Sequence, residues 1–310
     1  MVWLEWSYNT QALIVRDTLN DLVAFIYVAR ERSFTKAAAQ LGVSQPALSR
    51  TIRKLEAHLD VRLLTRSTRS VVPTEAGVRL LETISPHFDG IEAGLGDLAE
   101  LSGKPTGSLR ITSVEHASAA ILVPAASRLM LDYPEISVEI NNDYGLVDIV
   151  AQRYDAGVRL GEQVAKDMIS MRIGPDFRQA VVAAPTYFER RGKPLMPHDL
   201  AAHTCINLRL PTSGGMWTWP FAKKGREVNV RAEGHVVGNT IQLMLDFALA
   251  GIGVAYLPEE IVAIDIAQGR LVRVLEDWCP PLSGYHLYYP SRRQPKPAFR
   301  LLLDALRASG

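Results

Sequence analysis

The sequence has few features of a membrane protein or of a disulfide-stapled secreted protein. It contains two cysteines in 310 residues, Cys205 and Cys279, which are too few for a disulfide framework. No apolar run approaches the ~18 residues that span a bilayer. The N-terminus lacks the basic start, the apolar stretch and the small-residue cleavage site of a signal peptide. We therefore expect a cytoplasmic chain with no membrane partner and two buried, unremarkable thiols.

The motifs of common catalytic and metal sites are also missing. The seven histidines are scattered and form neither an H-E-x-x-H pair nor a cluster with cysteine. No G-x-S-x-G turn is present. The pair Gly251 and Gly253 lacks the third glycine of a dinucleotide fingerprint and precedes an expected strand instead of a helix. The sequence therefore predicts no enzyme activity, no catalytic residue, no metal site and no cofactor.

Length and charge indicate two unlike domains. A chain of 310 residues suggests two, at ~150 residues each. Residues 30–79 carry ten Lys or Arg and four acids, a net charge of +6, whereas the other 260 residues carry 24 basic and 29 acidic side chains. A basic module on a mildly acidic body is typical of a local site for a polyanion, although a charged face alone is usually solvated surface.

The basic module contains SFTKAAAQLGVSQPALSRTIRKLEAHLDVRLLTR, from Ser33 to Arg66, with two apolar runs at helical spacing around Gly42. Two helices joined by a tight turn with glycine form a helix-turn-helix. Ser33 and Ser44 are expected N-caps. Donors and cations that suit bases and phosphates lie off the apolar stripe of the second helix: Gln45, Ser49, Arg50, Arg53 and Lys54.

The pattern S-F-T-x-A-A-x-x-L-x-x-S-Q-P-A-L-S-x-x-I-x-x-L-E-x-x-L-x-V-x-L-x-x-R resembles the DNA-binding segment of LysR-type transcriptional regulators. The resemblance implies a regulator that binds a double-stranded DNA operator as a homodimer or homotetramer and responds to a small-molecule effector. The alternative is a charged helical hairpin without DNA contacts. The DNA-binding residues that the resemblance implies are Thr35, Ser44, Gln45, Pro46, Ser49, Arg50, Arg53, Lys54, Arg66 and Arg69, with Gln45, Pro46, Ser49 and Arg50 nearest the bases.

The segments around this motif complete an expected N-terminal half. Residues 1–16 match nothing in the family and are either an extension or the result of a start assigned upstream of a true start at Val15. Residues 17–75 are the expected winged helix-turn-helix, with 61–73 as the wing. Residues 76–102 follow as a linker helix, whose apolar seam from Leu81 to Leu98 favours dimerisation over a role as an ordinary core helix. Pro86 lies inside the seam and is expected to kink or break the helix.

Residues 103–108 read as a hinge linker, and residues 109–310 alternate strands with helices. Such alternation predicts an α/β sheet covered on both faces. This part resembles the family's effector domain, which has the two-subdomain fold of type 2 periplasmic binding proteins. We expect subdomain I at about 109–161 and 269–310 and subdomain II at about 162–268. A solute-binding protein or an enzyme on the same fold is the competing function, and the helix-turn-helix argues against both.

Open α/β sheets bind ligands beyond the carboxyl ends of their strands, where helix N-termini favour anions. Arg159 and two helix ends would suit a small carboxylate or another anion. Single residues here could instead only cap a helix or pair with an acid. The expected effector-binding residues are Ser113, Asn142, Arg159, Asn239 and Thr240, with His116 as a further candidate.

Overall fold

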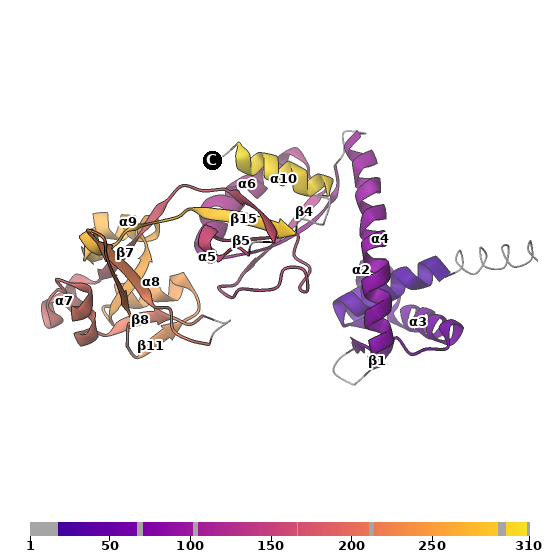
Figure 1. Cartoon of the computed structure of the whole chain (residues 1–310), viewed down its shortest axis with the longest axis horizontal. Coiled ribbons are helices and arrows are strands. Elements are labelled where there is room, and N and C mark those ends of the chain that lie inside the picture. Colours follow the sequence, from indigo (N-terminus) through magenta and orange to yellow (C-terminus); the bar gives the residue numbers. More distant parts are fainter. Residues whose placement is uncertain are drawn as a thin grey trace, which may run out of the picture. The chain divides into compact units, whose positions relative to one another are not determined.

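The computed structural model describes residues 18–66, 71–101, 105–165, 167–210, 214–290 and 296–308 (Figure 1). The chain divides into two compact units, Met1–Leu95 and Gly96–Gly310. The proposed extension at 1–16 and Arg69 lie outside the described residues. Every described helix is too short or too polar to cross a membrane.

The N-terminal unit is built on three helices: a first one covering residues 18–31, α2 (Phe34–Leu41) and α3 (Gln45–Leu59). Both expected caps are present, because the Ser33 hydroxyl accepts from the Lys36 N–H and the Ser44 hydroxyl from the Ala47 N–H, each at 3.3 Å. Asp60 ends α3 in the left-handed region at φ 51°. An aspartate tolerates this conformation, so the turn forms there without glycine.

The wing follows α3 as the antiparallel strands β1 (Leu64–Arg66) and β2 (Val71–Pro73). Glu56 of α3 fixes its start, since one carboxylate oxygen accepts from the backbone N–H groups of Leu63 and Leu64 at 2.9 and 3.0 Å. The segment 61–73, expected as the wing, thus contains two paired strands, and residues 67–70 between them lie outside the described residues.

Helix α4 (Glu75–Leu101) continues through Pro86, so of the expected kink or break the break does not occur. Proline removes one backbone hydrogen bond, while the remaining turns and the packing of Leu81 and Ile84 on the domain core keep the helix continuous. The side chain of Arg30 also binds Asp89 of α4 at 2.9 Å. Only part of the seam is therefore surface: Ile91, Leu95 and Leu98 are exposed.

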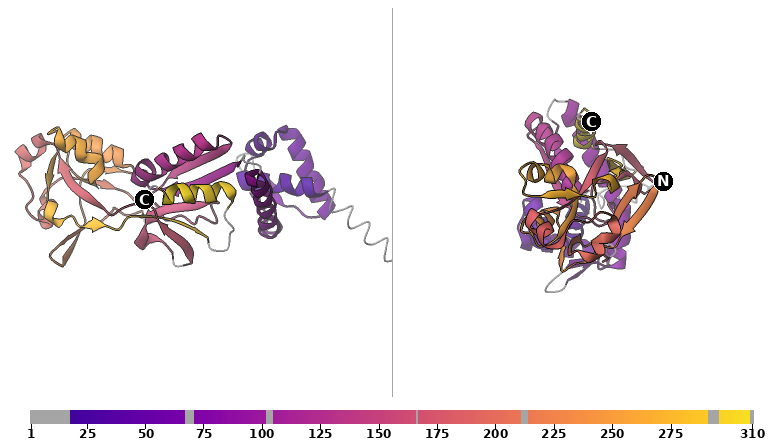
Figure 2. Two further views of the ribbon diagram at one scale, coloured as in Figure 1. Left: turned by 90° about the horizontal axis from the view of Figure 1, so that it is seen from above. Right: turned by 90° about the vertical axis from the view of Figure 1, so that its left-hand side faces the viewer.

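The C-terminal unit contains two sheets. The first has the order β4-β3-β5-β15-β6, from β3 (Gly107–Ser113), β4 (Ile136–Asn142), β5 (Ala156–Leu160), β6 (Met168–Arg172) and β15 (Tyr285–Pro290). Helices α6 (Val123–Asp132) and α10 (Pro297–Arg307) lie side by side and share its core (Figures 1 and 2). The short α5 (Glu115–Ala117) and a π-helical turn (Ser118–Leu122) lead into α6.

The second sheet has the order β11-β8-β12-β7-β13, with β14 also paired to β7. Its strands are β7 (Phe177–Ala183), β8 (Cys205–Leu208), β11 (Val236–Gly238), β12 (Val254–Pro258), β13 (Val272–Val274) and β14 (Pro281–Leu282). Helix α8 (Ile241–Leu249) packs on one face, and the hairpin β9 (Trp219–Lys223) and β10 (Arg226–Val230) contributes to the core on the other. Helices α7 (Pro185–Arg191) and α9 (Glu259–Ala267) complete the unit.

The chain crosses between the sheets later than expected. Strand β6 pairs in the first sheet, and β13 and β14 pair in the second. The crossovers therefore lie at residues 173–176 and 283–284, instead of at 161/162 and 268/269. At this point Gly284 approaches the first crossover so closely that a Cβ on it would lie 2.2 Å from the Gly174 carbonyl oxygen.

Both cysteines belong to the core of the second subdomain, as expected. Cys205 and Cys279 are free thiols with at most 1 % of their surface exposed. Burial raises the pKa of Cys205 to about 12 and the pKa of Cys279 to about 11. Because the thiolate is the reactive form, both groups are inert at neutral pH.

Candidate DNA-binding surface and effector site

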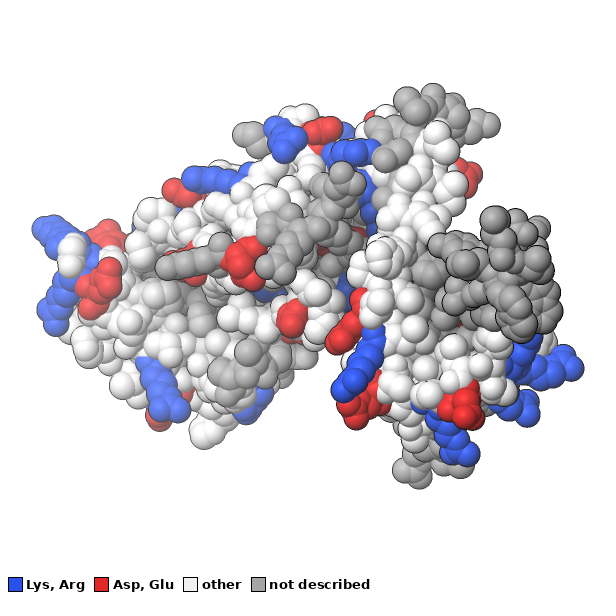
Figure 3. All heavy atoms as spheres, turned by 45° about the vertical axis from the view of Figure 1, so that its right-hand side comes forward, with Lys and Arg blue, Asp and Glu red and all other residues white. Residues whose placement is uncertain are grey.

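Helix α3 has one buried face and one exposed face. Leu48, Ile52 and Leu55 have at most 2 % of their surface exposed and pack with α2 and the first helix in one core. Apolar residues at this spacing form a single stripe, so the residues between them point to solvent. The packing therefore orients a polar, cationic face outward. Lys and Arg side chains gather on the lower part of the N-terminal unit in Figure 3.

Most of the expected DNA-binding residues lie on that outward surface. Ser49 is half-buried, Arg66 is the last residue of β1, and Arg69 lies outside the described residues. The exposed ones are Thr35, Ser44, Gln45, Pro46, Arg50, Arg53 and Lys54.

The contacts of these side chains differ. The Thr35 hydroxyl lies 3.4 Å from the Gln45 side-chain oxygen, and Arg53 donates to the Ser49 carbonyl at 3.3 Å. Lys54 lies 3.4 Å from a carboxylate oxygen of Asp21 while its side chain stays 69 % exposed. Among the described residues Arg50 has no hydrogen-bond or ion-pair partner, so its planar set of donors is available to a ligand.

Gly77 explains why the sequence Thr74-Glu75-Ala76-Gly77 follows the wing. A Cβ on Gly77 would lie 2.1 Å from the carbonyl oxygen of Leu63. The same oxygen accepts from the Thr74 N–H at 2.9 Å, and the Thr74 hydroxyl accepts from the Gly77 N–H at 3.1 Å. Only glycine allows the start of α4 to approach the start of the wing so closely.

The first expected effector-binding residues lie at the ends of β3 and β4. Ser113 pairs in register with Asn142 across these parallel strands. Ser113 is fully buried, and its hydroxyl donates to the Val114 carbonyl at 3.1 Å. The Asn142 side-chain oxygen accepts from the Ser118 hydroxyl at 2.5 Å. The structure therefore brings the two strand ends and the start of the following helix together, as the sequence predicted.

Arg159 is much less accessible than its position after a strand suggested. It lies inside β5 with 1 % of its surface exposed. Its terminal N–H groups donate to the Val158 and Gly145 carbonyls at 2.7 Å and to the Thr112 hydroxyl at 3.2 Å. Burial lowers the pKa of the guanidinium. Arg159 therefore stabilises the loop after β4 from within, and most of its donors are engaged.

His116 connects the two subdomains. The ring is 5 % exposed, with Nδ1 3.1 Å from the Tyr285 hydroxyl and Nε2 3.3 Å from a carboxylate oxygen of Glu260 in α9. The ring also packs against Phe177, which stacks on Tyr285. Burial lowers the pKa of His116, and the Glu260 carboxylate opposes this effect. The sequence identified His116 as a candidate but could not predict these partners.

The remaining candidates lie at the start of α8. Thr240 is its N-cap, and the hydroxyl accepts from the Leu243 N–H at 3.3 Å. The next N–H, that of Ile241, donates to the side chain of Glu115 at 2.8 Å. This bond between α5 and α8 brings the loop with Ser113 and His116 next to the loop with Asn239 and Thr240. Glu115 was missed as a site residue because its partner lies 126 positions away.

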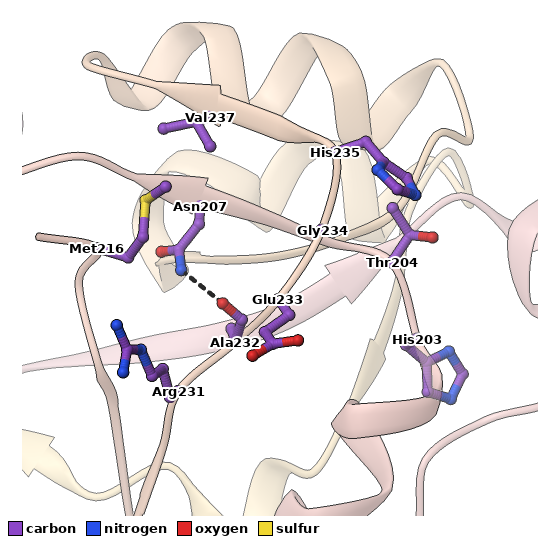
Figure 4. Close-up of a pocket in the computed structure, with 10 residues that line it drawn as sticks. All are labelled: His203, Thr204, Asn207, Met216, Arg231, Ala232, Glu233, Gly234, His235 and Val237. Atoms are coloured by element: carbon purple, nitrogen blue, oxygen red, sulfur yellow. Dashed lines mark hydrogen bonds between the residues drawn. The ribbon is translucent and has the colours of Figure 1, made fainter.

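A pocket of about 530 Å³ lies in the second subdomain (Figure 4). The Asn207 amide beneath it donates to the Ala232 carbonyl at 3.0 Å. The pocket contains none of the six expected effector-binding residues. It is lined by His203, Thr204, Asn207, Met216, Arg231, Ala232, Glu233, Gly234, His235 and Val237. No cluster of metal-binding side chains occurs among the residues that the structure describes.

Both halves of the chain match known domains. Residues 19–78 match the bacterial regulatory helix-turn-helix of the lysR family, and residues 102–310 match the LysR substrate binding domain. The HTH-type transcriptional regulator PgrR of Escherichia coli is 49% identical over 295 residues, 95% of this chain and 99% of that protein.

Two solved full-length structures share the fold. The virulence activator AphB of Vibrio cholerae has a TM-score of 0.60 and 24% identity, covering 94% of this chain and 98% of that one. CrgA of Neisseria meningitidis has a TM-score of 0.56 and 26% identity, with the same coverage of each chain. The chain belongs to the LysR family of transcriptional regulators, whose helix-turn-helix domain binds DNA and whose substrate-binding domain binds an effector.

Proposed function

We propose that α3 lies in the major groove of an operator, with Gln45, Pro46, Ser49 and Arg50 nearest the base edges. The exposed guanidinium of Arg50, which has no partner among the described residues, carries this proposal, because arginine recognises guanine through two parallel hydrogen bonds. Three further groups on α3 and the wing contact phosphates: Arg53, Lys54 and Arg66. Arg69 at the wing tip is proposed for the same role from the sequence.

A gel shift with the DNA upstream of the chain's own gene tests this arrangement. Arg50→Ala should weaken specific binding by about 1–3 kcal/mol and relax the preference at one base pair. Arg307→Ala is the matched control, because it removes an exposed arginine from α10 of the C-terminal unit, whose partner among the described residues is Asp304. Equal affinity of the Arg50 variant and the wild type would exclude Arg50 from base readout.

We further propose that two or four copies assemble through α4, so that a dimer reads two half-sites. The second half of the helix supports this, because Ile91, Leu95 and Leu98 are 56, 62 and 63 % exposed at coiled-coil spacing. Sedimentation of Leu95→Glu should show smaller particles than the wild type.

A DNA-bound regulator works where the chromosome is, which in a bacterium is the cytoplasm.

The effector is proposed to bind where the ends of β3 and β4 meet the start of α8, beside Ser113, His116, Asn142, Asn239 and Thr240. The buried Ser113 hydroxyl and the two contacts between the subdomains, from His116 to Glu260 and from Glu115 to Ile241, support this position. The expectation of an anionic effector has less support, since Arg159 and the N-terminus of α8 are engaged within the chain. A thermal-shift screen of small metabolites against the full chain, repeated with Asn142→Ala, tests the site.

A further inference from the structure

Glu115 occupies the place where the proposed effector site would hold an anion. Its side chain accepts from the N–H of Ile241, the first residue of the nine-residue helix α8. Helix N-termini carry about half a positive charge and bind carboxylates or phosphates through such free N–H groups. Here the carboxylate comes from the other subdomain of the same chain, and the Thr240 hydroxyl occupies the Leu243 N–H of the same turn.

The negative charge of Glu115 also acts on a neighbouring residue of the first subdomain, Tyr144. The pKa of the Tyr144 hydroxyl, in the loop after β4, is raised mainly by burial and further by the negative charge of Glu115. Glu260 of α9 lies against the neighbouring residue His116, so a second carboxylate faces the same inter-subdomain contact.

Few cations lie near these carboxylates in the described loops, and the Glu259 carboxylate, the neighbour of Glu260, is paired with Arg273 of β13. The stretches 113–118, 142–148, 159–165, 239–242 and 258–260 contain one basic residue other than histidine, Arg159. Its guanidinium is 1 % exposed and donates to backbone carbonyls and to Thr112. The acids in these stretches are Glu115, Asp143, Asp148, Glu162, Glu259 and Glu260.

We propose that Glu115 is the specificity-determining residue of the effector site. Its carboxylate occupies the N-terminus of α8, where an anion would otherwise bind. The site therefore takes a ligand that presents a hydrogen-bond donor, such as an ammonium or hydroxyl group, to this carboxylate. An anion is excluded because it would have to displace Glu115 and break the bond that joins α5 to α8. This inference rests on the proposed location of the effector site and names the chemistry that the site selects.

The test asks whether removal of the carboxylate creates an anion site. The unfolding temperature of the full chain is measured in sodium acetate and in sodium chloride at equal ionic strength and neutral pH. The wild type should unfold at the same temperature in both salts. Glu115→Ala should unfold at a temperature higher by about 3–6 °C in acetate, at roughly ten times the dissociation constant, because acetate replaces the missing carboxylate.

Glu162→Ala is the matched control. It removes an exposed carboxylate that has no partner among the described residues, from a neighbouring loop, and it should behave as the wild type does. If Glu115→Ala does not fold, Glu115→Gln keeps an oxygen for the Ile241 N–H and should still show a greater acetate effect than the wild type. Equal acetate stabilisation of wild type and variants, or no effect in either variant, overturns the proposal.

This experiment measures unfolding and uses neither DNA nor the natural effector. A failed acetate test therefore leaves DNA binding and the gel shift untouched. Conversely, if the screen places the effector elsewhere, the acetate result still shows whether Glu115 blocks an anion site at α8.

Discussion

Gly77→Ala is expected to destabilise the N-terminal domain although alanine is the better helix former. The added Cβ would lie 2.1 Å from the Leu63 carbonyl oxygen, whereas real Cβ contacts are essentially never shorter than 3.0 Å. The start of α4 and the start of the wing must therefore separate by at least 0.9 Å. The Leu63 oxygen also accepts from the Thr74 N–H at 2.9 Å, so this movement weakens a hydrogen bond as well.

Together these effects predict a clear loss of stability of the N-terminal domain. Overpacking costs about 1–3 kcal/mol and a lost hydrogen bond about 1 kcal/mol. The gain from replacing glycine in a helix is at most about 1 kcal/mol and is smaller here, because Gly77 lies in the first turn. The net loss of about 1–3 kcal/mol corresponds to at least ~4 °C in the melting temperature of a domain of 60–100 residues.

Calorimetry of the full chain at fixed protein concentration measures this change in the transition of the N-terminal unit. Gly90→Ala in the same helix is the matched control, since a Cβ there meets nothing within 4 Å. It should stabilise the domain by about 0.5–1 kcal/mol through helix propensity alone. If Gly77→Ala is as stable as Gly90→Ala, the close approach of α4 to the wing is not what requires glycine.

Three other predictions concern charge and reactivity. Arg69→Ala should reduce the slope of log affinity against log salt by about 1 without changing the preferred operator, and a changed preference in a binding-site selection would contradict the phosphate role. Cys205 and Cys279 should not react with a thiol reagent at pH 8 until the protein is unfolded, when both react; labelling of the native protein would contradict their burial. Because the folded pKa of His116 lies below its unfolded value, the unfolded state takes up more protons as pH falls below about 6.5, and stability is lost. His116→Gln should make that loss smaller in denaturant titrations between pH 7 and pH 5, and an unchanged pH dependence would remove His116 as its source.

The elements that could be predicted are those whose signals are local. Ser33 and Ser44 cap their helices with their own hydroxyl groups, and Asp60 accepts the left-handed turn at φ 51°. Each of these features depends on a few neighbouring residues, so it can be predicted from the sequence.

The elements that were missed depend on distant partners. Helix α9 has no apolar stripe: Asp265 is buried and pairs with Arg270, whereas Ile264 is 66 % exposed. Periodicity could not identify it. The hairpin of β9 and β10 had a readable signal, since Lys224 and Gly225 form its turn with positive φ values of 52° and 77°. The helix does not break at Pro86, because the packing of Leu81 and Ile84 before it and the ion pair of Asp89 with Arg30 after it hold the turns on both sides.

In the candidate effector site, too, the positions of strand ends could be predicted from the sequence, whereas contacts between distant residues could not. Sequence position correctly brought Ser113 and Asn142 together, because parallel strands end at one edge of a sheet. It could not reveal that Arg159 donates to carbonyls of its own subdomain or that Glu115 binds α8. Arg159 and the N-terminus of α8 thus already have partners within the chain, although Arg159 Nε has none among the described residues. Our proposal that the site selects a hydrogen-bond donor therefore depends on contacts between residues far apart in the sequence, which no local pattern predicts.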